Sequence, residues 1–161
     1  MTRKKAVSHY KTMLGYSLLA VGIILFDRIT KYFVMMYGYV YITSFCALNL
    51  DYNMGITFGM FPARTIGQVW TIIGFASCIT VLVAVAGWMR YRQGYSSIPE
   101  LLIVSGSLSN LIDRIIYGGV VDFIELSYDR YVWPPFNVAD IAIVVGTFLL
   151  VLSVYASSHE K

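Results

Sequence analysis

Two aspartates, Asp122 and Asp140, have surroundings suited to acid–base chemistry. Asp122 follows the flexible pair Gly118 and Gly119, and Asp140 falls in the first turn of an apolar stretch, where the positive end of a helix favours an anion. Two carboxylates held together in a poorly hydrated place cannot both ionise easily, so they share one proton. Such a pair can activate water and protonate a leaving amine, although structural hydrogen bonding or a proton relay would also explain it.

Four further ionisable residues lie within apolar stretches: Asp27, Lys31, Asp113 and Arg114. At membrane depth each costs at least about 2.5 kcal/mol on insertion scales, so it needs a partner, water or a function. Asp27 and Lys31 are four residues apart and share a helix face, which favours an ion pair with a structural role. Asp113 and Arg114 point about 100° apart on a helix, so the partner of each is expected on another element.

The composition indicates the elements that position these residues. Of the 161 residues, 58% are hydrophobic and only 13% are charged. A soluble domain normally carries about 25% charged residues. A soluble domain of this size also has too small an interior to bury so many apolar side chains. The composition also excludes a disordered chain. We therefore expect an all-α membrane protein with four transmembrane helices and a small β-rich segment outside the membrane.

Four apolar stretches supply the predicted spans, each near the roughly 20 residues that cross a bilayer as a helix. They cover about residues 14–36, 66–89, 97–117 and 137–155. Ser97 and Glu100 have the spacing of a capping box at the start of the third stretch. Pro134 and Pro135 forbid a helix before the fourth, and Asn137 is well suited to be its N-cap. Residues 1–161 are expected to form one membrane-embedded domain.

The Lys and Arg residues near the span ends predict the topology. With both termini cytoplasmic, seven of them lie inside and two outside, while three fall within spans. Residues 37–63 and 118–136 then face outward, and the alternation at residues 39–43 predicts a small sheet lying on the membrane. Asp122 and Asp140, 18 residues apart, are thereby placed near the same outer boundary.

Other classes of protein are disfavoured by what the chain carries. The net charge of +3, without a basic stripe, does not indicate nucleic-acid binding. Cys46 and Cys78 are too few and too far apart for a disulfide framework. Neither cysteine has nearby Cys or His partners, so a zinc or iron enzyme is not expected.

Five short motifs follow one another along the chain. They are Asp27-Arg28-Ile29-Thr30-Lys31, Asn53-Met54-Gly55-Ile56-Thr57-Phe58, Asn110-Leu111-Ile112-Asp113-Arg114, Val120-Val121-Asp122-Phe123 and Phe136-Asn137-Val138-Ala139-Asp140. In this order they resemble the motifs of lipoprotein signal peptidase, also called signal peptidase II. Any one motif would be a weak signal, but five in order are a strong one.

The resemblance implies a bacterial inner-membrane aspartic endopeptidase with its active site near the outer, periplasmic face. Such an enzyme removes the signal peptide of a prolipoprotein immediately before a cysteine that carries a diacylglyceryl group. It uses no metal or organic cofactor. The implied partners are prolipoprotein substrates, membrane lipid and the peptide antibiotic globomycin as an inhibitor, and a monomer is expected.

The resemblance also assigns site residues. It implies that Asp122 and Asp140 are the catalytic pair, with one ionised carboxylate taking a proton from water while the other, protonated, polarises the scissile carbonyl. Which aspartate does which stays open, because a coupled pair titrates as a unit. The residues that line or support the site are Asp27, Lys31, Asn53, Gly55, Asn110, Asp113, Arg114, Asn137 and Ala139.

Asn53 is expected to contact the backbone of the substrate or of globomycin. Two departures from the family pattern bear on substrate or inhibitor preference more than on the reaction. Ile56 and Thr57 stand where two small residues are common, and Ser109 stands where a glycine is often found. Ser109 is also one of three small residues, with Ser105 and Gly106, that predict a close approach between the third span and a neighbour.

Two other functions would use the same residues differently. A proton-coupled transporter or channel could relay protons through Asp27, Asp113, Asp122 and Asp140. That hypothesis predicts acids spread across the membrane depth, whereas three of these four fall toward one face and no span is broken near its centre. A non-catalytic assembly factor would leave the clustered aspartates unexplained.

Overall fold

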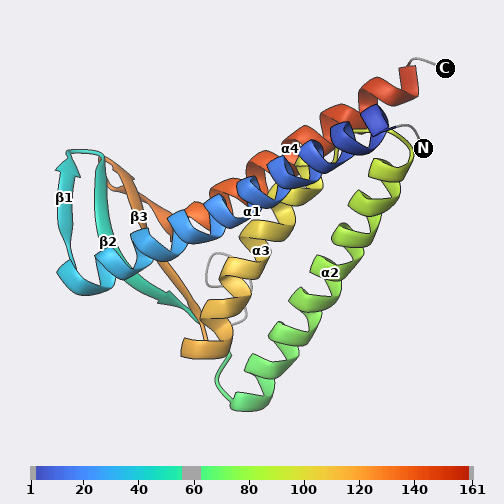
Figure 1. Cartoon of the computed structure of the whole chain (residues 1–161). Coiled ribbons are helices and arrows are strands. Elements are labelled where there is room, and N and C mark those ends of the chain that lie inside the picture. The colour runs from blue at the N-terminus through green and yellow to red at the C-terminus, as the bar shows by residue number, and fades with distance from the viewer. Residues whose placement is uncertain (1–2, 56–62, 160–161) are drawn as a thin grey trace.

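A computed structural model describes residues 3–55 and 63–159 of the chain. It contains four helices, α1 (Arg3–Tyr37), α2 (Ile66–Arg92), α3 (Ile98–Tyr117) and α4 (Val138–His159). The strands are β1 (Val40–Thr43), β2 (Cys46–Asn53), β3 (Val120–Tyr128) and β4 (Tyr131–Phe136). The helices form a bundle with the sheet at one end, while the start of α1 and the end of α4 lie together at the other end (Figure 1).

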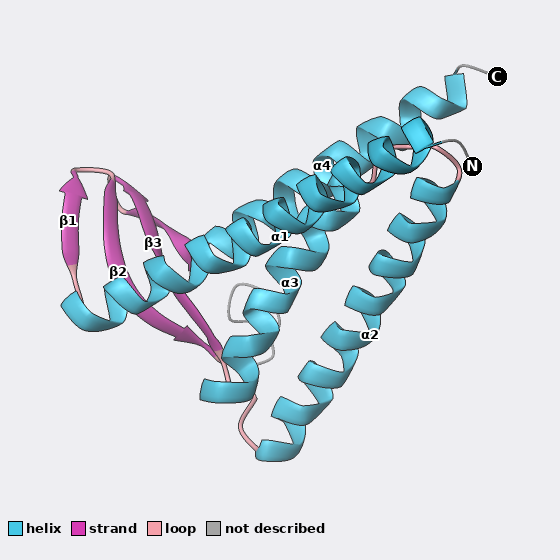
Figure 2. Cartoon of the chain, viewed as in Figure 1, coloured by secondary structure: helices cyan, strands magenta, loops and turns pink. Residues whose placement is uncertain are grey.

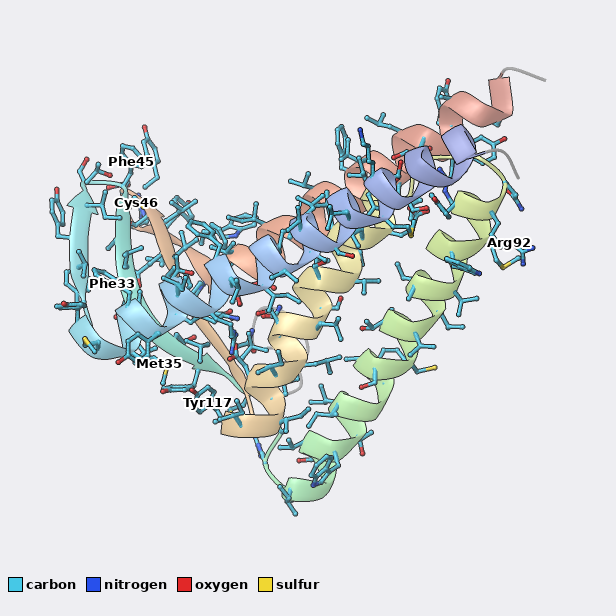
Figure 3. All side chains as sticks on the ribbon, viewed as in Figure 1. Phe33, Met35, Phe45, Cys46, Arg92 and Tyr117 are labelled. Atoms are coloured by element: carbon cyan, nitrogen blue, oxygen red, sulfur yellow. The ribbon has the colours of Figure 1, made fainter. Side chains whose placement is uncertain are left out.

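Two of the helices have the length and composition of membrane spans. Windows in α2 and α4 have a mean hydropathy of 2.3, and only 11% of each window is buried. Buried apolar helices form the core of soluble proteins, but here large side chains such as Leu82 and Phe148, each 62% exposed, cover the outside. Side chains project from α2 on the side where no other element lies, with Arg92 and Tyr117 at opposite ends of the bundle (Figure 3). The predicted span at residues 14–36 lies within α1, and the one at residues 97–117 consists of the N-cap Ser97 followed by α3.

The sheet joins the two segments that were predicted to face outward. Its four strands are antiparallel in the order β1-β2-β3-β4, so β2 from the first segment pairs with β3 from the second (Figure 2). A small sheet in the first segment is confirmed, and the pairing with the second segment is additional. Pro134 and Pro135 lie in the edge strand β4, where a missing N–H is tolerated, and no helix passes through them.

The start of α3 contradicts the predicted capping box. Ser97 is the N-cap, but its side chain makes no cap hydrogen bond. Its hydroxyl instead donates to the carbonyl oxygen of Gly87 over 2.7 Å, and Oε1 of Glu100 lies 2.7 Å from Nε of Arg90. The prediction is wrong because both side chains turn toward α2 rather than toward their own helix terminus.

Small residues let α3 and α4 approach closely, as predicted. A Cβ atom added at Gly106 would collide with the carbonyl oxygen of Ala139 and lie 2.9 Å from the Ile143 side chain. One added at Gly146 would lie 2.7 Å from the carbonyl oxygen of Pro99. The close approach allows side chains one turn further along α3 to reach the first turn of α4.

Candidate active site

Asp122 and Asp140 are both held by Asn137, the residue that precedes α4. The side-chain amide of Asn137 donates to Oδ1 of Asp122 over 2.6 Å. The backbone N–H of Asn137 donates to Oδ2 of Asp140 over 3.1 Å. One residue therefore contacts both carboxylates, at the place where β3 passes the start of α4.

The first turn of α4 explains the position of Asp140. Oδ1 of Asn137 accepts the backbone N–H of Asp140 over 2.9 Å, while the Asp140 carboxylate accepts the backbone N–H of Asn137. This reciprocal pair has the geometry of a capping box, with Asp in place of the usual Glu. The predicted N-cap role of Asn137 is confirmed. The same bonds aim a carboxylate at the positive end of the helix.

Asp122 is only 2% exposed on β3, beside the neighbouring strand β2. The side-chain amide of Asn53 donates to its Oδ2 over 3.0 Å. Burial, and then the charge of Asp140, raise the pKa of Asp122 to about 7, although the hydrogen bonds from Asn53 and Asn137 favour the ionised form. Near neutral pH this carboxyl group can therefore either carry or release a proton.

The amide of Asn53 is itself oriented by the chain that follows it. Gly55 is buried, and its backbone N–H donates to Oδ1 of Asn53 over 3.0 Å. With the amide oxygen engaged in this way, the amide nitrogen faces Asp122. Gly119 permits the close approach of β3, because a Cβ atom there would lie 3.0 Å from the carbonyl oxygen of Asn53.

A second group of charges lies beside the aspartate pair, between α1 and α3. Nζ of Lys31 lies 2.7 Å from Oδ2 of Asp27 and 2.7 Å from Oδ2 of Asp113. Arg28 adds contacts of 3.2 Å to Asp27 and 2.6 Å to Asp113. We call these four residues the ion cluster. The predicted pair of Asp27 and Lys31 is confirmed, as is the expectation that Asp113 finds its partner on another element.

Neutral groups complete the bonding of the ion cluster. Oγ of Ser109 donates to Oδ2 of Asp27 over 2.7 Å, and the backbone N–H of Ala139 donates to Oδ1 over 2.9 Å. The backbone N–H of Val121 donates to Oδ2 of Asp113 over 3.1 Å. The ion cluster thus ties α1 and α3 to the two segments that carry Asp122 and Asp140.

Asn110, on α3, connects the two groups. Its Oδ1 accepts hydrogen bonds from Lys31 over 3.0 Å and from the side-chain amide of Asn137 over 3.2 Å. Its Nδ2 donates to Oδ1 of Asp140 over 2.8 Å. Because two donors engage the amide oxygen, the amide nitrogen is left to face the carboxylate.

The other predicted site residues have less direct roles. Arg114, on the last turn of α3, is 7% exposed. It interacts electrostatically with three aspartates, Asp122, Asp140 and Asp113. Ile56 and Thr57, whose side chains depart from the family pattern, lie outside the described residues.

Sequence reasoning missed Arg28 and the hydrogen-bonding role of Ser109. Arg28 was assigned no partner, although a guanidinium at membrane depth needs one and Asp27 precedes it. The sequence predicts Ser109 as a small packing residue and as a departure from the family pattern, but its hydroxyl is also fully buried against a carboxylate. The rule that buried polar groups have partners could have found both.

The chemical character of the two groups differs. Among the side chains that the structure describes, no ion pair includes Asp122 or Asp140, and the hydrogen bonds to their carboxylates come from amides. The same part of the chain holds no group of three or more His, Cys, Asp or Glu side chains placed to bind a metal ion. Because the donors to Asp122 and Asp140 are neutral amides, they can orient the two carboxylates while a proton moves.

Comparison with known proteins identifies relatives over most of the chain. Residues 19–156 match the family model described as signal peptidase (SPase) II. The lipoprotein signal peptidase of Pseudoalteromonas atlantica is 35% identical over 149 residues, which cover 88% of this chain and 90% of that protein. The lipoprotein signal peptidase of Burkholderia mallei is 37% identical over 142 residues, which cover 86% of this chain and 84% of that protein.

Two solved structures, both bacterial membrane enzymes studied by the in meso method, have similar folds. The first has a TM-score of 0.74 and 24% identity, and the match covers 91% of each chain. The second has a TM-score of 0.67 and 25% identity, covering 87% of this chain and 92% of the other.

Proposed function

The chain belongs to the signal peptidase II family of membrane proteases, and we propose that Asp122 and Asp140 are the aspartic pair with which it cleaves prolipoprotein signal peptides. The observation that carries this proposal is the contact of Asn137 with both carboxylates. The raised pKa of Asp122, about 7, supports it, because an acid–base group works best near the operating pH. The family does not favour the proton-relay hypothesis.

In the proposed reaction the pair shares one proton at rest. The ionised carboxylate takes a proton from water, whose oxygen attacks the scissile carbonyl carbon while the protonated carboxyl group donates a hydrogen bond to the carbonyl oxygen. When the C–N bond breaks, the leaving amine takes a proton from the pair, and the new acid and amine depart. Arg114 and the amides of Asn110 and Asn137 keep the carboxylates oriented while charge moves.

The proposed substrate is a signal peptide attached to a diacylglyceryl-modified cysteine, cut immediately before that cysteine. It enters from the side of a four-span bundle, with its lipid tails still in the outer half of the cytoplasmic membrane. The position of the sheet and the aspartate pair, at the end away from both termini, supports a site on the outer face with the termini in the cytoplasm. The Asn53 side chain, which donates to Asp122, is proposed to contact the peptide backbone of the substrate or of globomycin as well. A monomer suffices for this scheme, because one chain carries both aspartates.

The test is cleavage of a lipidated precursor by the purified variants Asp122→Asn and Asp140→Asn. Each should lower kcat by about a thousandfold or more, because the two carboxylates work as a unit. Asp129→Asn, which changes an exposed carboxylate in the turn after β3, is the matched control and should cleave normally. Cleavage at the wild-type rate by either pair variant would refute the catalytic assignment.

A further inference from the structure

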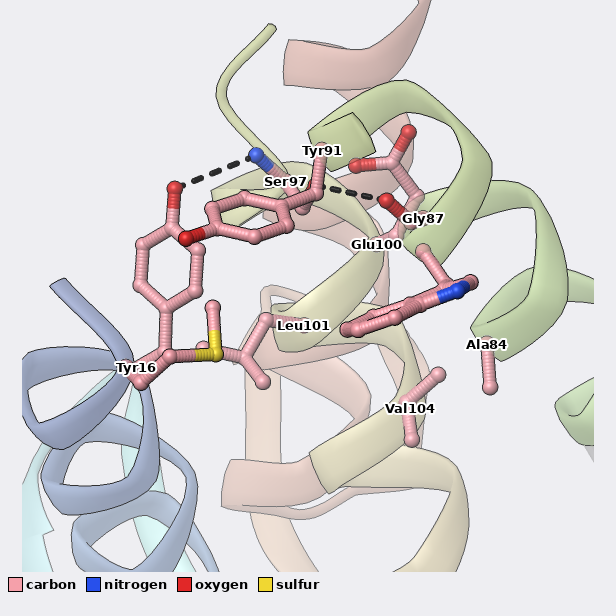
Figure 4. A pocket seen from close by; sticks show the side chains of 10 residues that line it. Tyr16, Ala84, Gly87, Tyr91, Ser97, Glu100, Leu101 and Val104 are labelled. Carbon is pink, nitrogen blue, oxygen red and sulfur yellow. Dashed lines mark hydrogen bonds between the residues drawn. The ribbon is translucent and has the colours of Figure 1, made fainter. Parts of the chain in front are cut away.

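Polar side chains outside the aspartate pair and the ion cluster differ in whether they have partners. At the far end of the bundle, a mostly apolar cavity between α1, α2 and α3 includes a few polar groups (Figure 4). The hydroxyl of Tyr16 accepts the backbone N–H of Ser97, whose own hydroxyl donates to Gly87. The carboxylate of Glu100 is buried beside Arg90. These polar groups serve contacts between the elements of the bundle.

Asp51, on β2, is different because it is exposed and without such contacts. Its side chain forms no ion pair or hydrogen bond with any residue that the structure describes. On the neighbouring strand β3, the residue directly opposite is Asp122. Residues directly opposite each other in an antiparallel pair point to the same face of the sheet, with Cβ atoms about 4.5–5.5 Å apart. Asp51 is therefore a third carboxylate beside the aspartate pair.

The neighbours of Asp51 on β2 agree with this orientation. Asn53, two residues further along the strand, points to the same face, and its amide donates to Asp122 over 3.0 Å. Tyr52 lies between them and points to the opposite face, where its ring lies 6.2 Å from that of Tyr117 at the end of α3. Asp51 therefore points to the face of the sheet that carries Asp122, and not to the face that meets Tyr117.

The position of Asp51 is unfavourable for the sheet itself. Like charges directly opposite each other destabilise an antiparallel pair, and Asp122 already has Asp140 as an acidic neighbour. The register of β2 against β3 also shifts between Leu48 and Asp51, and such bulges often re-aim side chains beside active sites. Choices that cost stability are expected at functional positions. A role toward the substrate accounts for a carboxylate at this place.

Asp51 lies at the open side of the site. Asn53 and Asn137 donate to Asp122, which is only 2% exposed. Asp51 is one strand further from β4, the strand that leads into α4, and it is exposed. A carboxylate that water reaches, and that no described cation neutralises, attracts a positive charge on a molecule that binds beside it. A cationic group of the substrate is the complementary partner.

The proposed substrate has one position for such a cation close to the bond that is cut. Signal peptides have small residues before their cleavage site, and the cysteine after the bond carries the lipid. The residue that follows the cysteine is therefore the first whose side chain can be charged. Its Cα lies about 5 Å from the bond in an extended peptide, in which each residue spans about 3.3 Å. This distance matches the roughly 5 Å between the Cβ atoms of opposite residues such as Asp51 and Asp122.

We propose that Asp51 is a specificity-determining residue, which favours a basic side chain directly after the lipidated cysteine and disfavours an acidic one. This inference rests on the proposed function and adds a substrate preference to it. The aspartate pair cuts the bond, and Asp51 selects among precursors by the charge of the first variable residue of the mature protein.

The experiment measures the cleavage of three lipidated precursor peptides in phosphatidylcholine nanodiscs. The peptides carry lysine, glutamine or glutamate directly after the cysteine. The wild-type chain should show a KM about fivefold lower for the lysine peptide than for the glutamate peptide, with similar kcat, because exposed attraction and repulsion each contribute a factor of roughly two. This KM ratio should fall close to one in Asp51→Asn and should invert in Asp51→Lys. Asp129→Asn, which changes an exposed carboxylate in the turn after β3, is the matched control and should keep the wild-type ratio.

The KM ratio compares peptides on one preparation, so a partly unfolded variant does not imitate the result. Raising the salt concentration from about 50 mM to about 500 mM should reduce the wild-type ratio, because salt screens exposed charges. A wild-type ratio near one, or a fivefold ratio that survives in Asp51→Asn, would overturn the role of Asp51. If the wild-type chain cleaves none of the three peptides, the proposed function itself fails.

The same variants test whether Asp51 acts on a group that all three peptides share. Cleavage releases an amine on the lipidated cysteine, and the phosphatidylcholine headgroup also carries a positive charge. If Asp51→Asn changes KM or kcat by the same factor for all three peptides, one of these common groups is the partner. The assignment to the residue after the cysteine is then wrong.

Discussion

The ion cluster and the aspartate pair lie side by side but hold their carboxylates in different ways. Asp27 and Asp113 each contact two cations, Arg28 and Lys31. Asp122 receives its hydrogen bonds from amides. Burial does not separate the two groups, because Asp27 and Asp113 are 0% exposed and Asp122 is 2% exposed. The charge of the donor separates them.

This difference indicates that the ion cluster has a structural role and the aspartate pair a chemical one. A buried carboxylate with cationic partners stays ionised, because losing its charge would leave those cations unpaired. A buried carboxylate with neutral donors can take up a proton at much smaller cost. The ion cluster can therefore hold α1 against α3 through paired charges, while neutral amides hold the carboxylates of the neighbouring pair. Asn110 is the only described residue whose side chain bonds both Lys31 and Asp140. Through these two hydrogen bonds the ion cluster fixes the position of the Asp140 carboxylate.

The largest expected effect is on stability and comes from Lys31→Met. The change keeps most of the side-chain volume but leaves Asp27 and Asp113 buried with Arg28 as their remaining cation. Breaking a buried ion pair from one side costs about 3–5 kcal/mol, so the free energy of unfolding should fall by that amount. Chemical denaturation of the purified protein in mixed micelles measures it.

Arg130→Gln is the control for that prediction. Arg130 and Asp129 are 3.7 Å apart, but their side chains are 83% and 75% exposed, so solvent screens the pair and no loss of stability is expected. Equal stability of Lys31→Met and the wild-type chain would show that the ion cluster does not hold the helices together.

The next effect is on catalysis and comes from Asn137. Asn137→Ser keeps an oxygen that can cap α4 but removes the N–H that donates to Asp122. We expect kcat to fall by about a hundredfold with little change in KM, because the carboxylate loses its orientation. Cleavage kinetics on a lipidated precursor provide the measurement.

Asn137→Ala separates the contribution of the N-cap to stability from the contribution of the side-chain amide to catalysis. It should show the same loss of kcat and, in addition, a free energy of unfolding lower by about 1 kcal/mol, because the N-cap is lost. If Asn137→Ser cleaved like the wild-type chain, the contact of one residue with both aspartates would have no catalytic meaning.

Local patterns in the sequence predicted the parts of the site that depend on one helix. The spacing of Asp27 and Lys31 predicted their ion pair, and the identity of Asn137 predicted the cap of α4. Both depend on residues three or four positions apart, where helix geometry alone sets the distance. The prolines before α4 likewise excluded a helix there.

Contacts between segments that are far apart in the chain could not be predicted from local sequence patterns. The bond from Asn53 to Asp122 needs β2 to pair with β3, which are about 70 residues apart, and no local rule sets that register. Ser97 and Glu100 had the right spacing for a cap, but packing against Gly87 and Arg90 outweighed it. Where the local pattern allowed these side chains either to cap α3 or to contact α2, the tertiary contacts of the buried polar groups determined their position.

A smaller effect on the ion cluster is expected from Ser109→Ala. The change removes one hydrogen bond to Asp27, while Lys31 and the Ala139 N–H keep that carboxylate bonded. The free energy of unfolding should fall by about 1.5 kcal/mol, and kcat should stay within about twofold of wild type. Ser105→Ala is the matched control, because the Ser105 hydroxyl donates to the carbonyl oxygen of Leu101 on its own helix, and it should cost less. A large loss of kcat without a loss of stability would place Ser109 with the aspartate pair instead.

The smallest expected effect is a displacement of the pH profile. Because the pKa of Asp122 is raised to about 7, the pair should lose its shared proton as the pH rises through that value, so kcat should decline on the alkaline side near pH 7. Stability has the same sign: the contribution of protonated Asp122 is complete below about pH 4 and is lost as the pH rises through about 7.

Asn53→Ala sharpens this prediction, since Asn53 donates to the ionised form of Asp122. Without that donor the proton binds more tightly, so the alkaline limb of the profile should move upward by roughly half a pH unit. Asn49→Ala, which removes an amide of the same strand that bonds Glu125 instead, should leave the limb in place. If the alkaline limb moved to lower pH in Asn53→Ala, the amide of Asn53 would favour the protonated carboxyl group of Asp122. The contrast between an ion cluster held by paired charges and an aspartate pair held by amides would then lose its basis.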